Sequence, residues 1–156
     1  MLPAALFLLL LGCGHDLRDG TYLFQREELL RETCTLDPPL PDRWEGSVQV
    51  RGATVSIRFD DPAFHATSAQ AVLVGRFDPN RNRETFRVNS SSEVETGVDG
   101  LSCLVYSQLQ LVATAQEDGS FDGTLTLTYS RQVVSEAGCP FSCVVEQQIH
   151  AVPSDG

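Results

Sequence analysis

The sequence predicts an all-β fold of about eight antiparallel strands in a meander, closed into a small barrel. Apolar and polar residues alternate with a period of two from Gly46 to Val152, and helical periodicity is nearly absent. Turn-forming residues separate the alternating segments. Because an open meander would leave two exposed sheet edges, closure into a barrel is the favoured arrangement. A sandwich of two sheets is the alternative.

The first strand begins after Asp19-Gly20, with Thr21–Arg26. Its continuation, Glu27–Glu32, fits either a strand or one helical turn, because Glu, Leu and Arg favour helices. Leu36–Arg43 contains three prolines, which cannot donate backbone hydrogen bonds, so it is expected to be an extended loop.

The second and third strands are predicted to form a hairpin with a defined register. The apolar positions are even-numbered before the turn and odd-numbered after it, so the numbers of paired residues must sum to an odd value. A two-residue Gly52-Ala53 loop with Gly52 at positive φ meets this requirement and pairs Val50 with Val55.

The middle of the chain is predicted to contain two strands and two loops. Asp60–Ala66 is a loop, and Ala69–Phe77 pairs with Thr85–Asn89 around the polar turn Asp78–Glu84. Ser90–Gly100 is rich in Ser and Glu and is expected to be a loop.

The sixth and seventh strands, Leu101–Gln116 and Phe121–Gln132, give a second register prediction. Their apolar positions are all odd-numbered, so paired residues must sum to an even number. A three-residue loop that ends at Gly119, with that glycine in the left-handed position of a G1 bulge, pairs Leu111 with Leu125.

The last strand is Cys143–Val152, and it places cysteines at one rim of the barrel. In an eight-strand meander the first strand ends where the sixth and the eighth begin. Two disulfides are therefore predicted at this rim among Cys34, Cys103, Cys139 and Cys143. The three pairings stay open, although extended chain would hold Cys139 and Cys143 beyond the ~7 Å Cα separation that a disulfide tolerates.

The N-terminus carries the clearest motif. Met1–Leu11 is almost wholly apolar but too short to span a bilayer, which is typical of a signal peptide. The following Leu10-Leu11-Gly12-Cys13 resembles the lipobox of bacterial lipoproteins. That resemblance implies cleavage before Cys13 and acyl chains, palmitate among them, on its thiol. Removing Cys13 also turns an odd cysteine count into an even one.

The resemblance implies a division of the chain into a signal peptide (1–12), a lipidated tether (13–19), a single β domain (20–152) and a C-terminal tail (153–156). The residue after Cys13 is Gly14 rather than Asp, which by analogy with Gram-negative lipoproteins implies a periplasm-facing position on the outer membrane. No basic residue precedes Arg18, so a secreted or periplasmic protein, or a true start farther upstream, remains the alternative.

Composition limits the partners. The chain has 21 acidic and 11 basic residues, a formal net charge of −10, which disfavours nucleic acid and anionic lipid headgroups. The same charge allows a basic protein partner.

No catalytic, metal or cofactor site is predicted. His15, His65 and His150 lack metal-ligand spacing, and no Gly-x-Ser-x-Gly elbow occurs. His150 is expected to face solvent. Asp60, Asp61 and His65 are the best candidates for an enzyme, but they come without a nucleophile.

A calcium loop is also not predicted. Asp78–Asn82 imitates its first positions, but Arg83 stands where an EF-hand needs Gly and Asn89 stands where it needs Glu. A polar turn is the expected structure. Trp44 and Tyr22 are expected to pack in the core or at a rim.

In size, acidity, lipidation and β content the chain resembles the small envelope barrels that include lipocalins and periplasmic lysozyme inhibitors. It lacks the Ser-Gly-x-x-Tyr loop of those inhibitors. The sequence therefore predicts a non-catalytic binding or interaction module anchored through Cys13. The alternatives are a carrier of an apolar ligand or lipid in a hollow barrel and an inhibitor of a basic envelope protein; an enzyme is least expected. A filled interior would favour protein contact over ligand carriage.

Overall fold

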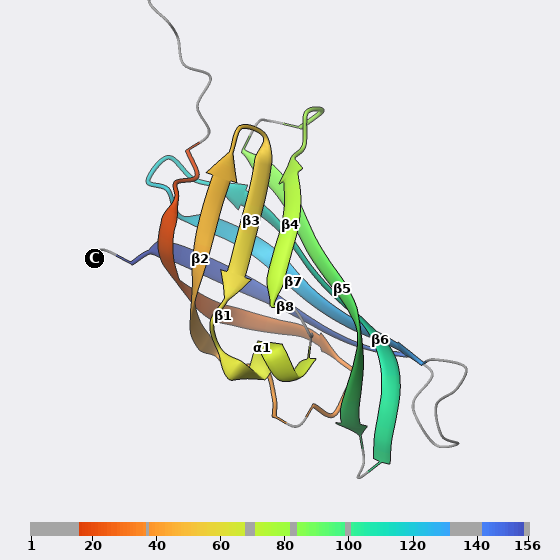
Figure 1. Ribbon diagram of the computed structural model, residues 1–156. Helices are drawn as coiled ribbons and strands as arrows, with labels where there is room; N and C mark the ends of the chain where they lie inside the picture. The colour runs from red at the N-terminus through yellow and green to blue at the C-terminus, as the bar shows by residue number, and fades with distance from the viewer. Residues whose placement is uncertain are drawn as a thin grey trace, which may run out of the picture.

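The computed structural model describes residues 16–36, 38–67, 71–81, 84–98, 101–131 and 142–154. They form a closed antiparallel barrel in which each strand pairs with its neighbours in the sequence and the last strand pairs with the first (Figure 1). The elements are β1 (Gly20–Glu32), β2 (Arg43–Arg51), β3 (Thr54–Phe59), α1 (Pro62–Thr67), β4 (Val72–Phe77), β5 (Thr85–Val98), β6 (Leu101–Ala115), β7 (Phe121–Arg131) and β8 (Ser142–Pro153). The predicted barrel is confirmed, and the sandwich is wrong.

The hairpin of β2 and β3 has the predicted register. Val50 pairs with Val55, and Gly52 begins the turn with a φ of 59°. Only a residue without a Cβ adopts this conformation readily, which is why the turn chemistry and the apolar pattern select the same pairing.

The hairpin of β6 and β7 is also confirmed. Leu111 pairs with Leu125. The Gly119 N–H donates to the Gln116 carbonyl at 2.9 Å, the Gln116 N–H donates to the Ser120 carbonyl at 2.8 Å, and Gly119 has a φ of 87°. These bonds and this φ describe the predicted three-residue turn with its G1 bulge.

Two local predictions need correction. Glu27–Glu32 continues β1 as a strand, so the helical alternative is wrong; irregular pairing with β8 follows Arg26 and Leu29. Most of the predicted Ser90–Gly100 loop is a strand, because β5 runs to Val98 and pairs with β6 throughout; Asp99 and Gly100 lie outside the described residues. Its polar side chains suggested a loop, but pairing with a neighbouring strand satisfies the backbone whatever side chains it carries.

A third correction concerns the predicted Asp60–Ala66 loop, because Pro62–Thr67 forms the short helix α1. Asp61 caps α1, because its Oδ1 accepts the Ala63 N–H at 2.8 Å, and Pro62 occupies the first turn. Phe64 is fully buried against Phe59 and Trp44, with ring centroids 4.5 and 5.1 Å away. The helix therefore covers one end of the barrel (Figure 1).

A layer of aromatic rings fills one level of the barrel interior. Phe24, Phe59, Phe86 and Phe121 come from the alternate strands β1, β3, β5 and β7, and all four are fully buried. Ring centroids are 5.1 Å apart for Phe24–Phe59, 5.7 Å for Phe24–Phe121 and 5.4 Å for Phe86–Phe121. A layer built from alternate strands bridges the barrel from wall to wall, so the interior at this level is a packed core.

The barrel has two distinct rims (Figure 1). We call the end with residues 16–19 and the β2–β3 and β6–β7 turns the N-terminal rim. The opposite end, with α1 and the disulfide of Cys34 and Cys143, is the disulfide rim.

Candidate functional site

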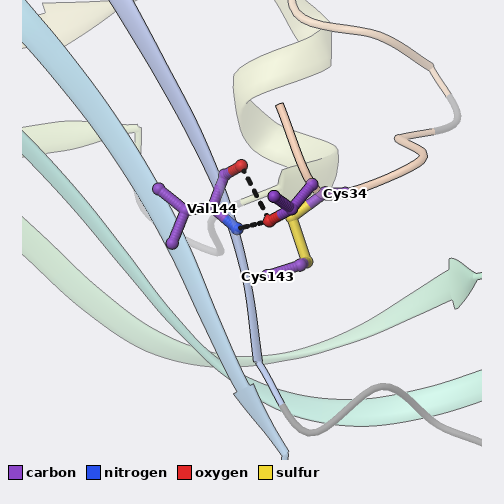
Figure 2. The surroundings of a disulfide bond; sticks show 4 residues. Cys34, Cys143 and Val144 are labelled. Atoms are coloured by element: carbon purple, nitrogen blue, oxygen red, sulfur yellow. Dashed lines mark hydrogen bonds between the residues drawn. A yellow bond between two sulfur atoms is a disulfide. The ribbon is translucent and has the colours of Figure 1, made fainter. Parts of the chain in front are cut away.

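The disulfide rim is stapled by a single described bond. Cys34, after β1, is bonded to Cys143, at the start of β8, with Cα atoms 5.0 Å apart and 109 residues of sequence between them (Figure 2). Both are buried. Beside the bond, the Thr33 hydroxyl oxygen accepts the Val144 N–H at 2.8 Å (Figure 2). The predicted placement of these two cysteines at one rim is confirmed.

The other cysteines are less fully described. The backbone of Cys103 pairs with Thr96 on β5, but its side chain lies outside the described part of the chain. Cys139 and Cys13 also lie outside the described residues. The second disulfide and the lipidation of Cys13 stay predictions.

Several polar contacts hold the N-terminal segment onto its rim. The Asp16 N–H donates to the Glu84 carboxylate at 3.3 Å, and the Arg18 N–H donates to the Tyr22 hydroxyl oxygen at 3.4 Å. The Asp19 carboxylate accepts the Val50 N–H at 2.6 Å and pairs with Arg51 at 2.8 Å. Mainly through the Val50 bond, and also through Arg51, these contacts lower the pKa of Asp19. The Tyr22 hydroxyl donates to the Gly119 carbonyl at 2.9 Å, and burial raises the pKa of this phenol.

The residues considered for catalysis take structural roles. Asp61 caps α1, and the Asp60 carboxylate pairs with Arg58 at 3.1 Å. His65 lies on α1, with its side chain outside the described residues. The two carboxylates are thus engaged by a helix and by a cation instead of being directed at a substrate.

His150 faces outward from β8, as predicted, and lies in a small polar cluster. Its Nδ1 is 2.6 Å from Asp122 Oδ1. Glu27, at an irregularity of β1, brings a second carboxylate, so that one ligand atom from each residue lies within 4.8 Å of the others. The three side chains sit at the surface, and the cluster alone does not indicate a bound ion. The sequence did not reveal it because three different strands supply its members.

The Asp78 turn is polar, as expected. Asp78 Oδ1 accepts the Asn80 N–H at 2.9 Å, and its Oδ2 lies 3.9 Å from Arg81 Nε. Asn82 and Arg83 lie outside the described residues.

A surface cleft of 630 Å³ lies beside the Asp78 turn, on the outer wall of β3, β4 and β5. Its polar lining includes Thr54, Arg76, Asn80, Arg87 and Asn89. Sequence reasoning missed this site, because the pairing of β4 with β5 had no unique register across a long polar turn.

The two aromatic residues singled out from the sequence belong to the core. Trp44 stacks on Phe24 with ring centroids 5.5 Å apart and planes inclined by 7°. Tyr22 is fully buried and contacts Phe121 at 5.5 Å. Both side chains pack inside the barrel, as expected.

Comparison with known proteins gives no family: no protein-family model and no curated protein matches the chain. Among the described residues, no helix combines the length and the hydrophobicity needed to cross a bilayer.

Proposed function

We propose that this protein is a lipid-anchored component of the cell envelope that acts as a non-catalytic interaction module. Acyl chains on Cys13 hold it on the periplasmic face of the outer membrane, and the barrel serves as a rigid scaffold for contact with another protein. The proposal rests on the lipobox-like Leu10–Cys13 and on the packed aromatic layer among the described residues of the barrel interior.

The packed interior is the observation that carries this proposal. A lipid or other apolar ligand needs a cavity of about 300 Å³ or more, lined by apolar side chains. The rings of Phe24, Phe59, Phe86 and Phe121 instead contact one another across the axis. This favours an interaction module over a carrier, and the engaged carboxylates Asp60 and Asp61 give no support to an enzyme.

The short connection to the anchor supports a defined orientation. Asp16 is three residues from Cys13, and three residues of extended chain reach about 10 Å. Because Asp19 and Tyr22 fix the following segment to the N-terminal rim, that rim faces the bilayer in this proposal. The disulfide rim then points into the periplasm.

The net negative charge of the chain favours a basic protein as its partner. A net charge of −10 steers a basic protein toward the barrel and repels acidic ones. The protein could act on such a partner as an inhibitor, because inhibition by binding requires an interaction surface and no catalytic residue.

Anchoring is tested by metabolic labelling with a fatty acid. We expect Cys13→Ser to abolish the label and release the protein from the membrane fraction. Gly14→Ser is the matched control, because it alters the neighbouring residue and leaves the thiol in place. Label retained by Cys13→Ser would refute the anchor.

Affinity capture of the exported protein from envelope extract tests the interaction role. Proteins and lipids are both identified by mass spectrometry. We expect a protein partner whose capture weakens as salt rises, as charge complementarity requires. Stoichiometric recovery of an apolar small molecule without a protein would contradict the proposal.

A further inference from the structure

We propose that Arg76 and Arg87 form a binding site for a phosphate-class oxyanion in the cleft on the outer wall of β3, β4 and β5. The site goes beyond the proposed function and does not depend on lipidation of Cys13.

The register places the two arginines side by side. Arg76 on β4 is the direct cross-strand partner of Arg87 on β5, and Thr54 on β3 is the partner of Arg76 on its other side. Directly opposed residues share a face of the sheet, with Cβ atoms about 5 Å apart. All three side chains line the cleft, and both arginines are exposed. Two cations are thereby held close together on rigid strands.

This arrangement is unfavourable without a counterion. Like charges directly opposite one another destabilise a sheet. Within the described part of the chain, neither guanidinium has an ion pair, although the protein has 21 acidic residues against 11 basic ones. The same chain supplies a carboxylate to Arg26, Arg51 and Arg58.

The carboxylate of Asp78, which also lines the cleft, is engaged elsewhere. It accepts the Asn80 N–H and lies near Arg81. The described wall of the cleft around Arg76 and Arg87 is therefore locally cationic, even though the whole chain is acidic.

The shape of the two groups selects the ligand. A guanidinium presents a planar fork of N–H donors, and the two oxygens of one carboxylate satisfy a single fork. Two adjacent forks need an anion with three or four oxygens, as in phosphate. The Asn89 amide and the Thr54 hydroxyl line the same cleft and add neutral donors.

The phosphate can be free or carried by a lipid headgroup. The cleft includes Asp78 and Asn80, which follow β4. β4 ends near the N-terminal rim (Figure 1), which would face the bilayer in the anchored protein. The experiment therefore separates the two sources.

The free anion is tested with inorganic phosphate as the probe. The full chain carrying Cys13→Ser is titrated in low-salt buffer, and binding is followed by calorimetry and by the shift in melting temperature. We expect saturable binding that Arg76→Gln and Arg87→Gln each weaken about tenfold or more, since each removes charged hydrogen bonds. Arg58→Gln, which alters an exposed arginine of β3 paired with Asp60, is the matched control and keeps the affinity.

The lipid source is tested with vesicles of phosphatidylglycerol and of a galactolipid without phosphate. Binding only to phosphatidylglycerol, lost in the double variant Arg76→Gln/Arg87→Gln, supports a headgroup site. Saturable binding of free phosphate that both single variants weaken supports a soluble ligand. Binding to neither probe, or binding that the double variant retains, overturns the site and leaves the anchoring experiment unaffected.

The melting temperature gives a second readout that a purely structural role would not produce. Without phosphate, Arg87→Gln is expected to melt at or above the temperature of the unsubstituted chain, because it relieves the repulsion from Arg76. Phosphate should stabilise the unsubstituted chain and not the double variant. Equal stabilisation of both would contradict the proposal.

Discussion

The two rims of the barrel are closed by different means. At the disulfide rim, Cys34 and Cys143 join segments 109 residues apart, and Phe64 of α1 covers the core. At the N-terminal rim, the Asp19 carboxylate accepts the Val50 N–H and the Tyr22 hydroxyl oxygen accepts the Arg18 N–H, and these bonds hold the segment that leads to Cys13. A covalent bond and buried rings resist pH and salt, whereas the exposed contacts of Asp19 respond to both. The contacts at the end proposed to carry the anchor are therefore the ones that pH and salt can weaken.

The largest expected loss of stability follows from a substitution at the disulfide rim. Cys143→Ser should lower the free energy of unfolding by about 2–4 kcal/mol, because the open chain gains conformational freedom over a long loop. Urea unfolding of the oxidised protein and of the variant gives the difference. A loss below about 0.5 kcal/mol would show that this bond contributes little to closure.

Thiol counting on the denatured, unreduced protein completes that test. In the Cys13→Ser background we expect no free thiol among Cys34, Cys103, Cys139 and Cys143. Two free thiols would eliminate the second predicted disulfide and leave the described one as the staple of this rim.

The next effect is at the N-terminal rim. Gly119→Val should cost about 1–2 kcal/mol or more, because a β-branched residue is strained at a φ of 87°. Glu117→Ala, at an exposed position of the same turn, is the control. It is cleaner than Asp118→Ala, since Asp118 accepts the Ser120 N–H at 2.9 Å. Equal melting temperatures for the Gly119 and Glu117 variants would refute the strained turn.

Tyr22→Phe should have a smaller effect, about 1 kcal/mol, since it removes the hydroxyl that donates to Gly119. Burial raises the pKa of Tyr22, so its contribution is complete below the usual value of 10.0 and is lost as pH rises through the raised one. The free energy of unfolding, measured as pH rises into the alkaline range, should therefore fall less steeply in the variant than in the unsubstituted chain. If the free energies of unfolding of the two proteins ran parallel against pH, the ionisation of Tyr22 would not be coupled to unfolding.

The smallest effect concerns Asp19. Its pKa is lowered by the Val50 N–H and by Arg51, so its stabilising contribution is present above the usual Asp value and is lost as pH falls through the lowered one. The protection of the Val50 amide against hydrogen exchange, taken relative to the intrinsic rate at each pH, should fall in acid, and Asp19→Asn should reduce that pH dependence. If the exchange profile of Asp19→Asn matched that of the unsubstituted chain, the Asp19 carboxylate would not hold the N-terminal segment in place.

The sequence predicted the fold where side-chain period and turn chemistry agreed. Val50–Val55 and Leu111–Leu125 paired as expected, because shifting either register by one residue would have turned apolar side chains into solvent. The placement of Cys34 and Cys143 at one rim followed from the same meander.

The remaining elements depended on contacts that local patterns do not encode. α1 is too short for helical periodicity, although Asp61-Pro62 is a cap signal that could have revealed it. Ser90–Val98 is polar and becomes a strand through pairing with β6. The opposition of Arg76 and Arg87 required the register of β4 against β5, which the long Asp78–Glu84 turn leaves open in the sequence.

Titration with a fluorescent fatty-acid analogue distinguishes a packed barrel that acts as a scaffold from a hollow barrel that carries a ligand. We predict no saturable one-to-one binding by the unsubstituted protein, because the rings of Phe24, Phe86 and Phe121 occupy the interior. A known fatty-acid-binding protein, titrated in the same way, is the positive control for the probe. Saturable one-to-one binding by the unsubstituted chain, as tight as that of the control protein, would contradict this conclusion.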